Sequence, residues 1–286
     1  MTIQRPKPKP GPVLASLCAV AVAVSACGTA AAPPRATRSP RPARTAQASP
    51  RDVRVPGWAF AGPDAIAADR TRVWVANNGG DSVTELSAVT GALVRVIAGR
   101  QYQLNGPVAI TADATNVWVA NATGNSLTEI NAATGALIRV ISAPRYQLNG
   151  PQAITADATH VWVASGNSKA LTEINAVTGA LIRVISLPDV PFAITANGSA
   201  VWLVVNVGAK SADGSRPHGS VIEVAATGRR VRTLSSPPFA DSDPGGAVAS
   251  AGNQVWVTDS KFLSNGAGWV TELSPANGAL MRLISG

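Results

Sequence analysis

A tandem repeat is the feature that most restricts the fold of this chain. A tryptophan preceded by valine recurs at spacings of 44, 44, 40 and 54 residues, at Trp74, Trp118, Trp162, Trp202 and Trp256. Two copies are nearly identical, since PVAITADATNVWVAN at 107–121 returns as PQAITADATHVWVAS at 151–165. A repeat of this length is one supersecondary unit, and such units bury a core only by stacking on one another.

Each unit contains four short apolar or alternating runs that are separated by turn residues. In the second unit these runs are VAITA, NVWVAN, SLTEINA and ALIRVIS, and no run has helical periodicity. Four strands in about 40–45 residues are typical of one blade of a β-propeller. The sequence therefore predicts an all-β propeller of about five four-stranded blades over residues 57–286. The blades are expected at about 62–98, 106–142, 150–186, 190–235 and 245–286.

The repeat also resembles a known family. The segment GPDAIAADRTRVWVANNGGDSVTELSAVTGALVRVI at 62–97 is similar to the YVTN propeller repeats, and to the related repeats of NHL proteins and streptogramin-lyase-like proteins. The resemblance covers essentially all of 57–286 and implies the architecture rather than any activity. Propellers of this family commonly have six or seven blades, which raises the question of how five blades would close.

Two arrangements are left open by the number of units. Residues 52–56 resemble the fourth strand of a unit, as in Leu181–Ile185, and would be surplus if the last unit supplies its own strand. In the first arrangement five blades close in one chain, with 52–56 as an additional edge strand. In the second the ring is truncated, or it is completed by pairing between chains.

The recurring residues are expected to be structural. Both faces of a blade are covered by neighbours, so each tryptophan should pack between blades. In each unit a glutamate on the third strand and an arginine nine or ten residues later should face each other across a hairpin. On an outer strand such a pair is worth about 0.2–1 kcal/mol. The pairs are Glu85 with Arg95, Glu129 with Arg139, Glu173 with Arg183, Glu223 with Arg232 and Glu272 with Arg282. Asp69, Asp113 and Asp157 are expected to form turns.

Residues 1–26 are predicted to be a lipoprotein signal peptide. Arg5, Lys7 and Lys9 precede an apolar run of fourteen residues at 13–26, which is too short to span a bilayer comfortably. Val24–Cys27 resembles the lipobox of bacterial lipoproteins, which implies that Cys27 becomes the lipidated first residue of the mature protein. An ordinary cleavage site with an incidental cysteine is the alternative. The prediction places the protein outside the cell, anchored to the outer face of the bacterial cytoplasmic membrane.

The segment 27–56 is expected to be a disordered tether rich in alanine, proline and arginine. The formal net charge of +8 comes from this part of the chain, because 1–56 hold nine Lys/Arg and one acid. Residues 57–286 hold fifteen basic and fifteen acidic residues, and a neutral domain lacks the basic surface that nucleic-acid binding needs. No nucleic-acid partner is therefore expected.

Departures from the repeat mark the candidate binding surface. The loops that enter the first strand and leave the second should share one rim of the ring, and the irregular segments 206–219, 235–246 and 259–268 fall there. Positions just before the first strand, which include 108, 192 and 246, also vary and should face the central channel. The candidate ligand residues on this rim are Asp64, Tyr102, Tyr146, Gln152, Asn206, Arg216, His218, Asp241, Asp243, Asp259 and Lys261. Solvated loops without a function are the alternative.

The function predicted from these features is a non-catalytic binding or scaffold domain. Its partner would be a protein, a cell-wall polymer or a small ligand, and the sequence requires neither a catalytic residue nor a cofactor. The alternative is a metal-dependent lyase or hydrolase, as a resemblance to streptogramin lyases or gluconolactonases would imply. A divalent metal would then need the acids Asp64, Asp241, Asp243 and Asp259. Neither His160 nor His218 belongs to an H-x-H or E-x-H pair, so the lyase chemistry is not supported residue by residue.

Overall fold

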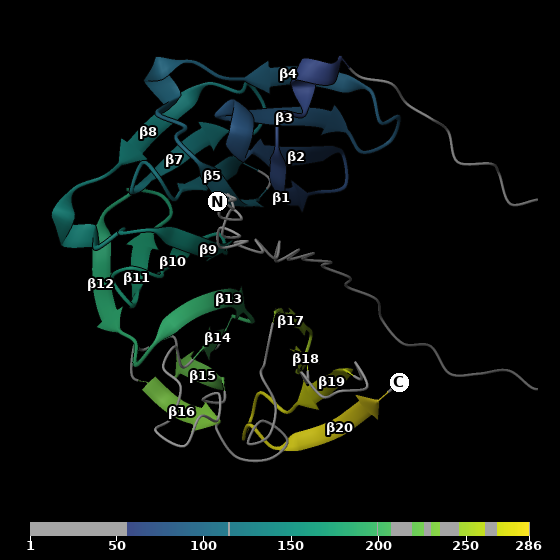
Figure 1. Cartoon of the computed structure of the whole chain (residues 1–286), viewed down its shortest axis with the longest axis vertical. Coiled ribbons are helices and arrows are strands. Elements are labelled where there is room, and N and C mark those ends of the chain that lie inside the picture. The colour runs from purple at the N-terminus through teal and green to yellow at the C-terminus, as the bar shows by residue number, and fades with distance from the viewer. Residues whose placement is uncertain are drawn as a thin grey trace, which may run out of the picture.

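The chain folds into five antiparallel four-stranded sheets, which confirms the predicted all-β fold (Figure 1). The computed structural model describes residues 56–285 apart from 114, 199, 207–218, 226–229, 235–245 and 261–267. The predicted signal peptide, Cys27, the tether and the strand-like segment 52–55 lie outside the described residues. No helix among the described residues is long and apolar enough to cross a membrane.

Every blade is built from consecutive strands. Blade 1 contains β1 (Pro63–Ala68), β2 (Arg72–Asn77), β3 (Ser82–Ser87) and β4 (Leu93–Ile97). Blade 2 contains β5 (Pro107–Ala112), β6 (Asn116–Asn121), β7 (Ser126–Asn131) and β8 (Leu137–Ile141). Blade 3 contains β9 (Pro151–Ala156), β10 (His160–Ser165), β11 (Ala170–Asn175) and β12 (Leu181–Ser186). Blade 4 contains β13 (Val190–Ala196), β14 (Ala200–Asn206), β15 (Ser220–Ala225) and β16 (Arg230–Leu234). Blade 5 contains β17 (Val248–Ala251), β18 (Gln254–Ser260), β19 (Gly268–Leu273) and β20 (Leu280–Ser285).

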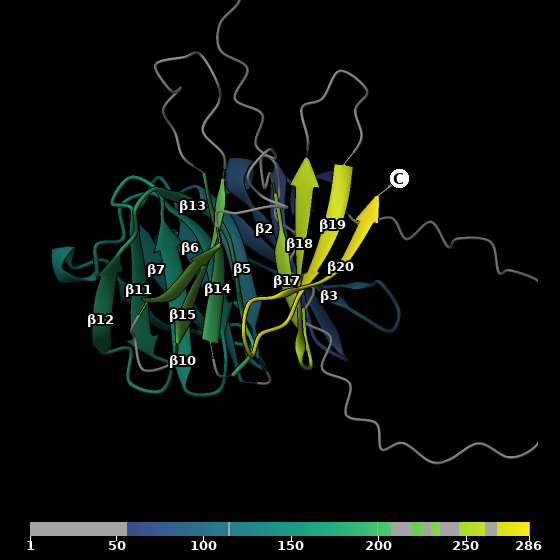
Figure 2. The ribbon, with the colours of Figure 1, turned by 90° about the horizontal axis from the view of Figure 1, so that it is seen from below.

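The blades are stacked side by side along an arc, with their first strands on its inner side (Figure 1). These inner strands, β1, β5, β9, β13 and β17, are neighbours in that order. The turned view shows the strands running between the two open faces of the arc (Figure 2). Short 3₁₀ turns connect elements on one of these faces: η1 (Gly57–Ala59), η2 (Asn78–Gly80), η3 (Arg100–Tyr102) and η4 (Pro144–Tyr146).

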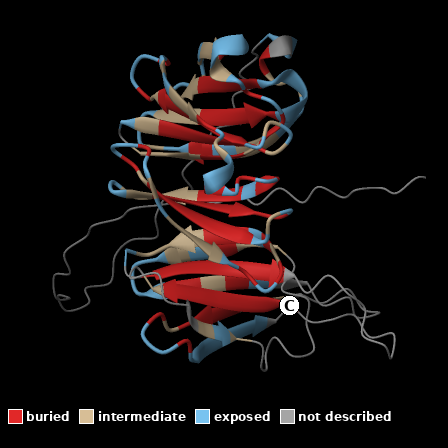
Figure 3. Cartoon of the chain, turned by 90° about the vertical axis from the view of Figure 1, so that its left-hand side faces the viewer, coloured by how far each residue is buried: buried red, intermediate tan, exposed pale blue. Residues whose placement is uncertain are grey.

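Each contact between two successive blades, here called a junction, has its own hydrophobic core. In the first junction Trp74 of blade 1 packs in one cluster with Ile110 and Val119 of blade 2. The same arrangement recurs in the next three junctions around Trp118, Trp162 and Trp202. These four tryptophans are at most 4% exposed, and buried residues run along the strand interiors (Figure 3). Four of the five tryptophans thus pack between blades, as the repeat predicted.

Four junctions join the five blades. Among the described residues no fifth hydrophobic core joins blade 5 to blade 1. Trp256, the counterpart of the four junction tryptophans, is only partly buried in blade 5. The described blades therefore form an open arc whose two ends are blade 1 and blade 5.

Side-chain hydrogen bonds shape the tight turns. The carboxylate of Asp69 accepts hydrogen bonds from the backbone N–H groups of Thr71 (2.6 Å) and Arg72 (2.7 Å), and Asp113 and Asp157 repeat the pattern. A polar residue that caps the backbone two and three positions later is an Asx turn, so the turn-forming role predicted for these aspartates is confirmed. The turns between third and fourth strands close at a glycine with left-handed backbone, such as Gly135 at φ 73°.

Candidate rim site

The connections into the first strand and out of the second strand meet on one face of the arc, here called the rim. In blade 1 the N–H of Asn78, just after β2, donates to the carbonyl of Gly62, just before β1 (2.8 Å). Blades 2 and 3 repeat this bond from residue 122 to Gly106 (2.8 Å) and from Gly166 to Gly150 (2.9 Å). The shared face expected from the sequence is therefore present in these three blades.

The variable positions before the first strands are β-bulges. The pairing of first and second strands skips one residue between Pro63 and Ala65, and the same shift occurs in blades 2 to 4. The skipped residues are Asp64, Val108, Gln152 and Phe192. A bulge leaves one residue unpaired and turns its side chain away from the ladder, and bulges are frequent beside binding sites. The sequence identified these positions by their variability but did not reveal the bulges.

The bulge side chains differ in chemistry and in exposure. Asp64 is partly buried and accepts a hydrogen bond from the amide of Asn78 (3.0 Å). Gln152 is exposed, and its amide lies over Gly166, where an added Cβ would come within 2.7 Å of it. Phe192 is 42% exposed. The inner edge of the rim therefore offers an acid, an amide and an aromatic ring from three different blades.

Two predicted rim residues are part of the junctions. Tyr102 of η3 donates its hydroxyl to the carbonyl of Gly135 in blade 2 (2.8 Å), and Tyr146 of η4 donates to Gly179 in blade 3 (2.9 Å). Tyr146 is only 5% exposed. A buried ring whose hydroxyl already has a backbone partner holds two blades together, so these tyrosines contribute to the frame of the rim rather than to its free surface.

Most of the other rim candidates cannot be placed. Arg216, His218, Asp241, Asp243 and Lys261 lie outside the described residues. For Asn206 and Asp259 only the backbone is described, in β14 and β18 respectively. Asn206 directly precedes the segment 207–218, and Asp259 lies one residue before the end of β18.

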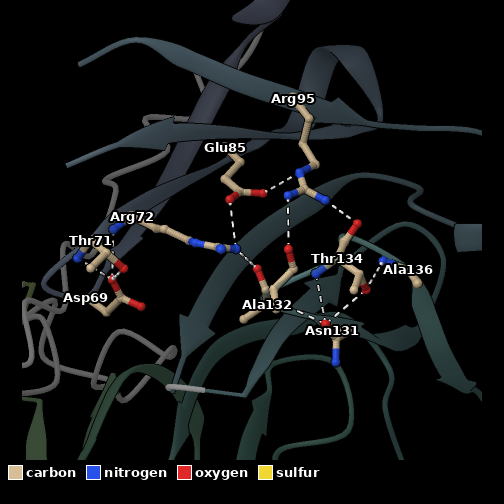
Figure 4. Close-up of polar contacts among 10 residues, drawn as sticks. Asp69, Thr71, Arg72, Glu85, Arg95, Asn131, Ala132, Thr134 and Ala136 are labelled. Atoms are coloured by element: carbon tan, nitrogen blue, oxygen red, sulfur yellow. Dashed lines mark hydrogen bonds and ion pairs between the residues drawn. The ribbon is translucent and has the colours of Figure 1, made fainter. Parts of the chain in front are cut away.

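The glutamate–arginine pairs form the most regular polar feature of the arc. The predicted register is confirmed in all five blades, because each glutamate of the third strand is the Cα partner of its arginine. The Nε–Oε2 distance is 2.8 Å for Arg95 with Glu85 (Figure 4). It is 2.6 Å for Arg139 with Glu129. The other three ion pairs join Arg183 to Glu173, Arg232 to Glu223 and Arg282 to Glu272.

The surface placement expected for the glutamates of these pairs is wrong, because their carboxylates are buried. The five glutamate side chains are at most 6% exposed. Arg95 continues into the next blade, where it donates to the carbonyls of Ala133 (3.1 Å) and Thr134, as Figure 4 shows. Removing one partner of a buried, hydrogen-bonded pair costs about 3–5 kcal/mol, well above the surface value. The sequence missed this because the covering blade is distant along the chain.

Arg183 of blade 3 departs from the other arginines in the atom that it uses. It contacts Oε2 of Glu173 through Nη2, whereas the other four arginines contact their glutamates through Nε. The side chain of Arg183 is 27% exposed and that of Glu173 only 2%. The surface ion pair predicted for Arg183 is therefore corrected to a pair with a buried carboxylate. The arginines of blades 1, 2 and 4 donate to the turn of the following blade, and for Arg183 the equivalent turn of blade 4, at 226–229, lies outside the described residues.

A second partner faces three of the glutamates from the residue two positions before the tryptophan. In blade 1 Arg72 lies 3.0 Å from Glu85 and also donates to the carbonyl of Ala132. In blade 5 Gln254 donates to Glu272 (2.6 Å), and in blade 3 His160 lies 3.6 Å from Glu173. The sequence offered no signal for this contact, since the residue type changes from blade to blade.

The carboxylate of Glu129 in blade 2 is perturbed by its burial. Its second-partner position is Asn116, and no described hydrogen bond joins this amide to Glu129. Burial raises the pKa of Glu129 to about 7; Arg139 opposes that rise, and the charge of Asp113 adds to it. One guanidinium alone does not compensate for the burial of this carboxylate.

The turn aspartates show the opposite shift. Burial acts to raise the pKa of Asp157, but hydrogen bonds from Thr159 and the N–H of His160 outweigh it and lower the pKa below its ordinary value. Thr71 and Arg72 lower the pKa of Asp69 in the same way, against the effect of burial. These carboxylates are held ionised by the turns that they form.

The repeated acids are thus engaged in turns and junctions. Among the described residues no group of three or more His, Cys, Asp and Glu side chains is arranged to hold a metal ion. His160 lies between Asp157 (3.5 Å) and Glu173 (3.6 Å) and packs on Trp162, with ring centroids 5.1 Å apart. It is a member of the blade 3 framework on the face opposite the rim.

Comparison with known proteins identifies the fold alone. No family model matches the chain, and no curated protein matches its sequence. Among solved structures the chain is similar to hydrazine synthase of Kuenenia stuttgartiensis, with a TM-score of 0.60 and 22% identity over 77% of this chain and 65% of that one. It is also similar to the computationally designed Ika8 protein, with a TM-score of 0.58 and 16% identity over 78% and 61%. Both are propeller-like, and the chain spans less than two thirds of the length of each.

Proposed function

We propose that this chain is an exported lipoprotein whose YVTN- or NHL-like propeller binds a partner through the rim without catalysing a reaction. The observation that carries the proposal is where the regular structure is interrupted. In blades 1 to 3 the second and third strands are joined by four residues, whereas β14 and β15 are separated by thirteen and β18 and β19 by seven. Long connections at one edge of a rigid scaffold are where binding residues concentrate.

The chemistry of the repeat supports binding over catalysis. The glutamates of the third strands are buried in ion pairs, and the turn aspartates accept backbone hydrogen bonds. The side chains that vary between blades at the rim include Gln152 and Phe192, which are exposed. An amide and an aromatic ring suit recognition of polar and apolar groups of a protein or a cell-wall polymer, and a small ligand is the third class of partner.

The membrane anchor is part of the proposal. The apolar run at 13–26 and the lipobox-like residues up to Cys27 support it, and the tether 27–56 would hold the propeller away from the bilayer. Cys27→Ser is expected to release the protein from the membrane fraction of a bacterial host and to abolish its labelling with radioactive palmitate. Membrane association and labelling that survive this substitution would contradict the anchor.

The rim is tested by loop replacement. Residues 206–219 are replaced by ATGN, the turn that blade 2 uses at 122–125, because Val205 pairs with Ser220 as Asn121 pairs with Ser126. Binding to purified cell-wall polymer and to envelope proteins is then measured by co-sedimentation and by pull-down. The replacement is expected to abolish binding and to leave the melting temperature nearly unchanged. Val177→Ala, an exposed position on the opposite face, serves as the control. Binding that survives replacement of 206–219 and alanine substitution of 235–245 would refute the rim as the site.

A further inference from the structure

The two ends of the arc carry the two halves of a junction that is not made within the described chain. At every junction one blade contributes the face that bears its tryptophan, here called the tryptophan face. The next blade contributes the opposite face, which bears the two aliphatic residues that flank its own tryptophan (two valines, except in blade 4, where they are Val201 and Leu203), here called the valine face. Among the described blades, blade 5 has an unpaired tryptophan face, and blade 1 has an unpaired valine face.

The exposure of equivalent residues shows that both faces are only partly covered: Val75 of blade 1 is 8% exposed, and Trp256 of blade 5 is partly buried. On the valine face, Ile66 of blade 1 is 39% exposed, whereas its counterparts Ile110 and Ile154 are 6% and 4% exposed. On the tryptophan face, Ile284 of blade 5 is 47% exposed, whereas Ile97 is 4% exposed. Of the equivalent positions, only those at the two ends are classed as exposed, since Ile185 and Leu234 inside the arc are partly buried, and this difference marks a missing neighbour.

The polar half of the junction is also incomplete at the two ends. Inside the arc, arginine guanidinium groups donate to the third residue of the next turn: Arg95 to Ala133 (3.1 Å), Arg139 to Val177 (3.0 Å) and Arg232 to Ala276 (3.3 Å). These three arginine side chains are 25–31% exposed.

Arg282 of blade 5 is the donor without a following blade. It is 63% exposed and, among the described residues, pairs with Glu272 of its own blade (3.3 Å). The corresponding acceptor at the other end of the arc is the carbonyl of Val89, in the turn of blade 1, which receives no arginine from the described residues. The chain therefore presents an arginine at one end and its usual acceptor at the other.

We propose that a second copy of this chain binds at these ends, with the tryptophan face of blade 5 in one copy against the valine face of blade 1 in the other. The face of blade 5 has an arginine and a tryptophan, and the face of blade 1 has the carbonyl acceptor and the valine surface that these groups contact inside the arc. Each face is therefore complementary to the other but not to a second copy of itself. The contact is therefore head-to-tail. Such contacts close into a ring when the rotation between copies permits and otherwise continue as an open chain.

The test separates the two faces by mutation. One variant of the full chain carries Arg282→Glu and Ile284→Asp on the tryptophan face, and a second carries Ile66→Asp on the valine face. Their mass is followed by analytical ultracentrifugation in mild detergent over a series of concentrations. The unmodified chain is expected to self-associate, and each variant is expected to be monomeric, with affinity lowered more than about tenfold. Ile138→Asp is the control, because Ile138 is also 39% exposed but lies in blade 2, away from both ends of the arc.

Mixing the two variants gives the decisive result. Each retains one intact face, so a head-to-tail contact predicts one 1:1 pair that grows no further. The formation of this pair also shows that both variants are folded. An unmodified chain that stays monomeric would overturn the proposal, which would leave the ends to a different partner. Self-association that survives in both variants, or a mixture that stays monomeric, would overturn it equally.

Discussion

The buried carboxylate of Glu129 allows a quantitative test of how the junctions are stabilised. Blade 1 surrounds Glu85 with two arginines, whereas blade 2 gives Glu129 only Arg139. Asn116→Arg would copy the blade 1 arrangement, with the new guanidinium placed between Glu129 and the carbonyl of Ala176. That carbonyl corresponds to Ala132, which Arg72 contacts in blade 1.

The expected gain in the free energy of unfolding follows from the raised pKa of Glu129. Folded Glu129, with a pKa of about 7 instead of the ordinary 4.5, holds its proton more tightly than the unfolded chain does. The contribution of Glu129 to wild-type stability therefore falls as the pH rises from about 4.5 to about 7, by at most about 3 kcal/mol at 1.4 kcal/mol per tenfold change. A second cation should return much of this free energy above pH 7. It should add little at pH 4, where the carboxyl is protonated in both states.

The assay is urea denaturation followed by tryptophan fluorescence at pH 4 and pH 8. The quantity to compare is the variant's free energy of unfolding minus that of the wild type, because other titrating groups cancel in this difference. The expected difference is about 1–3 kcal/mol at pH 8 and near zero at pH 4. Asn116→Gln controls for size without charge. An equal gain at both pH values, or a gain that persists when Glu129→Gln is added, would show that the explanation from charge is wrong.

Further predictions concern the packing and the turns. Trp118→Ala should cost about 3–5 kcal/mol of unfolding free energy, and Trp256→Ala clearly less, because Trp256 faces an open end; equal losses in denaturation would mean that both ends are covered. Tyr146→Phe should cost about 1 kcal/mol through the lost bond to the blade 3 turn, and an unchanged midpoint would contradict that role. Because the folded pKa of Asp157 is lowered, its ionised form stabilises the protein above the unfolded pKa, and this contribution is lost as the pH falls through the folded value. Asp157→Asn should therefore destabilise at pH 7 and have little effect at pH 2, as a pH series of thermal melts would show. Ca²⁺, Mg²⁺ and Zn²⁺ are expected to leave the melting temperature unchanged; a rise that Asp64→Ala removes would favour the metal-dependent lyase or hydrolase instead.

Local rules account for the part of the fold that the sequence predicted correctly. A Thr-Gly or Asn-Gly turn sets the register of the hairpin that follows it, so the positions of Glu129 and Arg139 along the chain were enough to place them opposite each other. The aspartate turns are equally local, since Asp113 caps residues two and three positions later.

Contacts between blades were harder to foresee because they join residues about forty positions apart. The carbonyl that receives Arg95 lies 38 residues along the chain, in the turn of the next blade. Tyr102 is a similar case. Its place in a loop suggested a ligand contact, but its hydroxyl donates to the carbonyl of Gly135, 33 residues along the chain. Local patterns show which element a residue belongs to, but they do not show which neighbour covers it.

The residue two positions before each tryptophan, on the second strand, determines whether the buried glutamate has a second polar partner. It varies between blades, whereas the glutamate and its arginine do not: the five residues are Arg72, Asn116, His160, Ala200 and Gln254. The four junctions therefore form whether this position is occupied by arginine, asparagine, histidine or alanine. Because burial raises the pKa of Glu129 to about 7, raising the pH through 7 should loosen the contact between blades 2 and 3. Hydrogen exchange at pH 6 and pH 8 would reveal this as faster opening of β6 and β7 than of β2 and β3, and uniform exchange across the blades would contradict it.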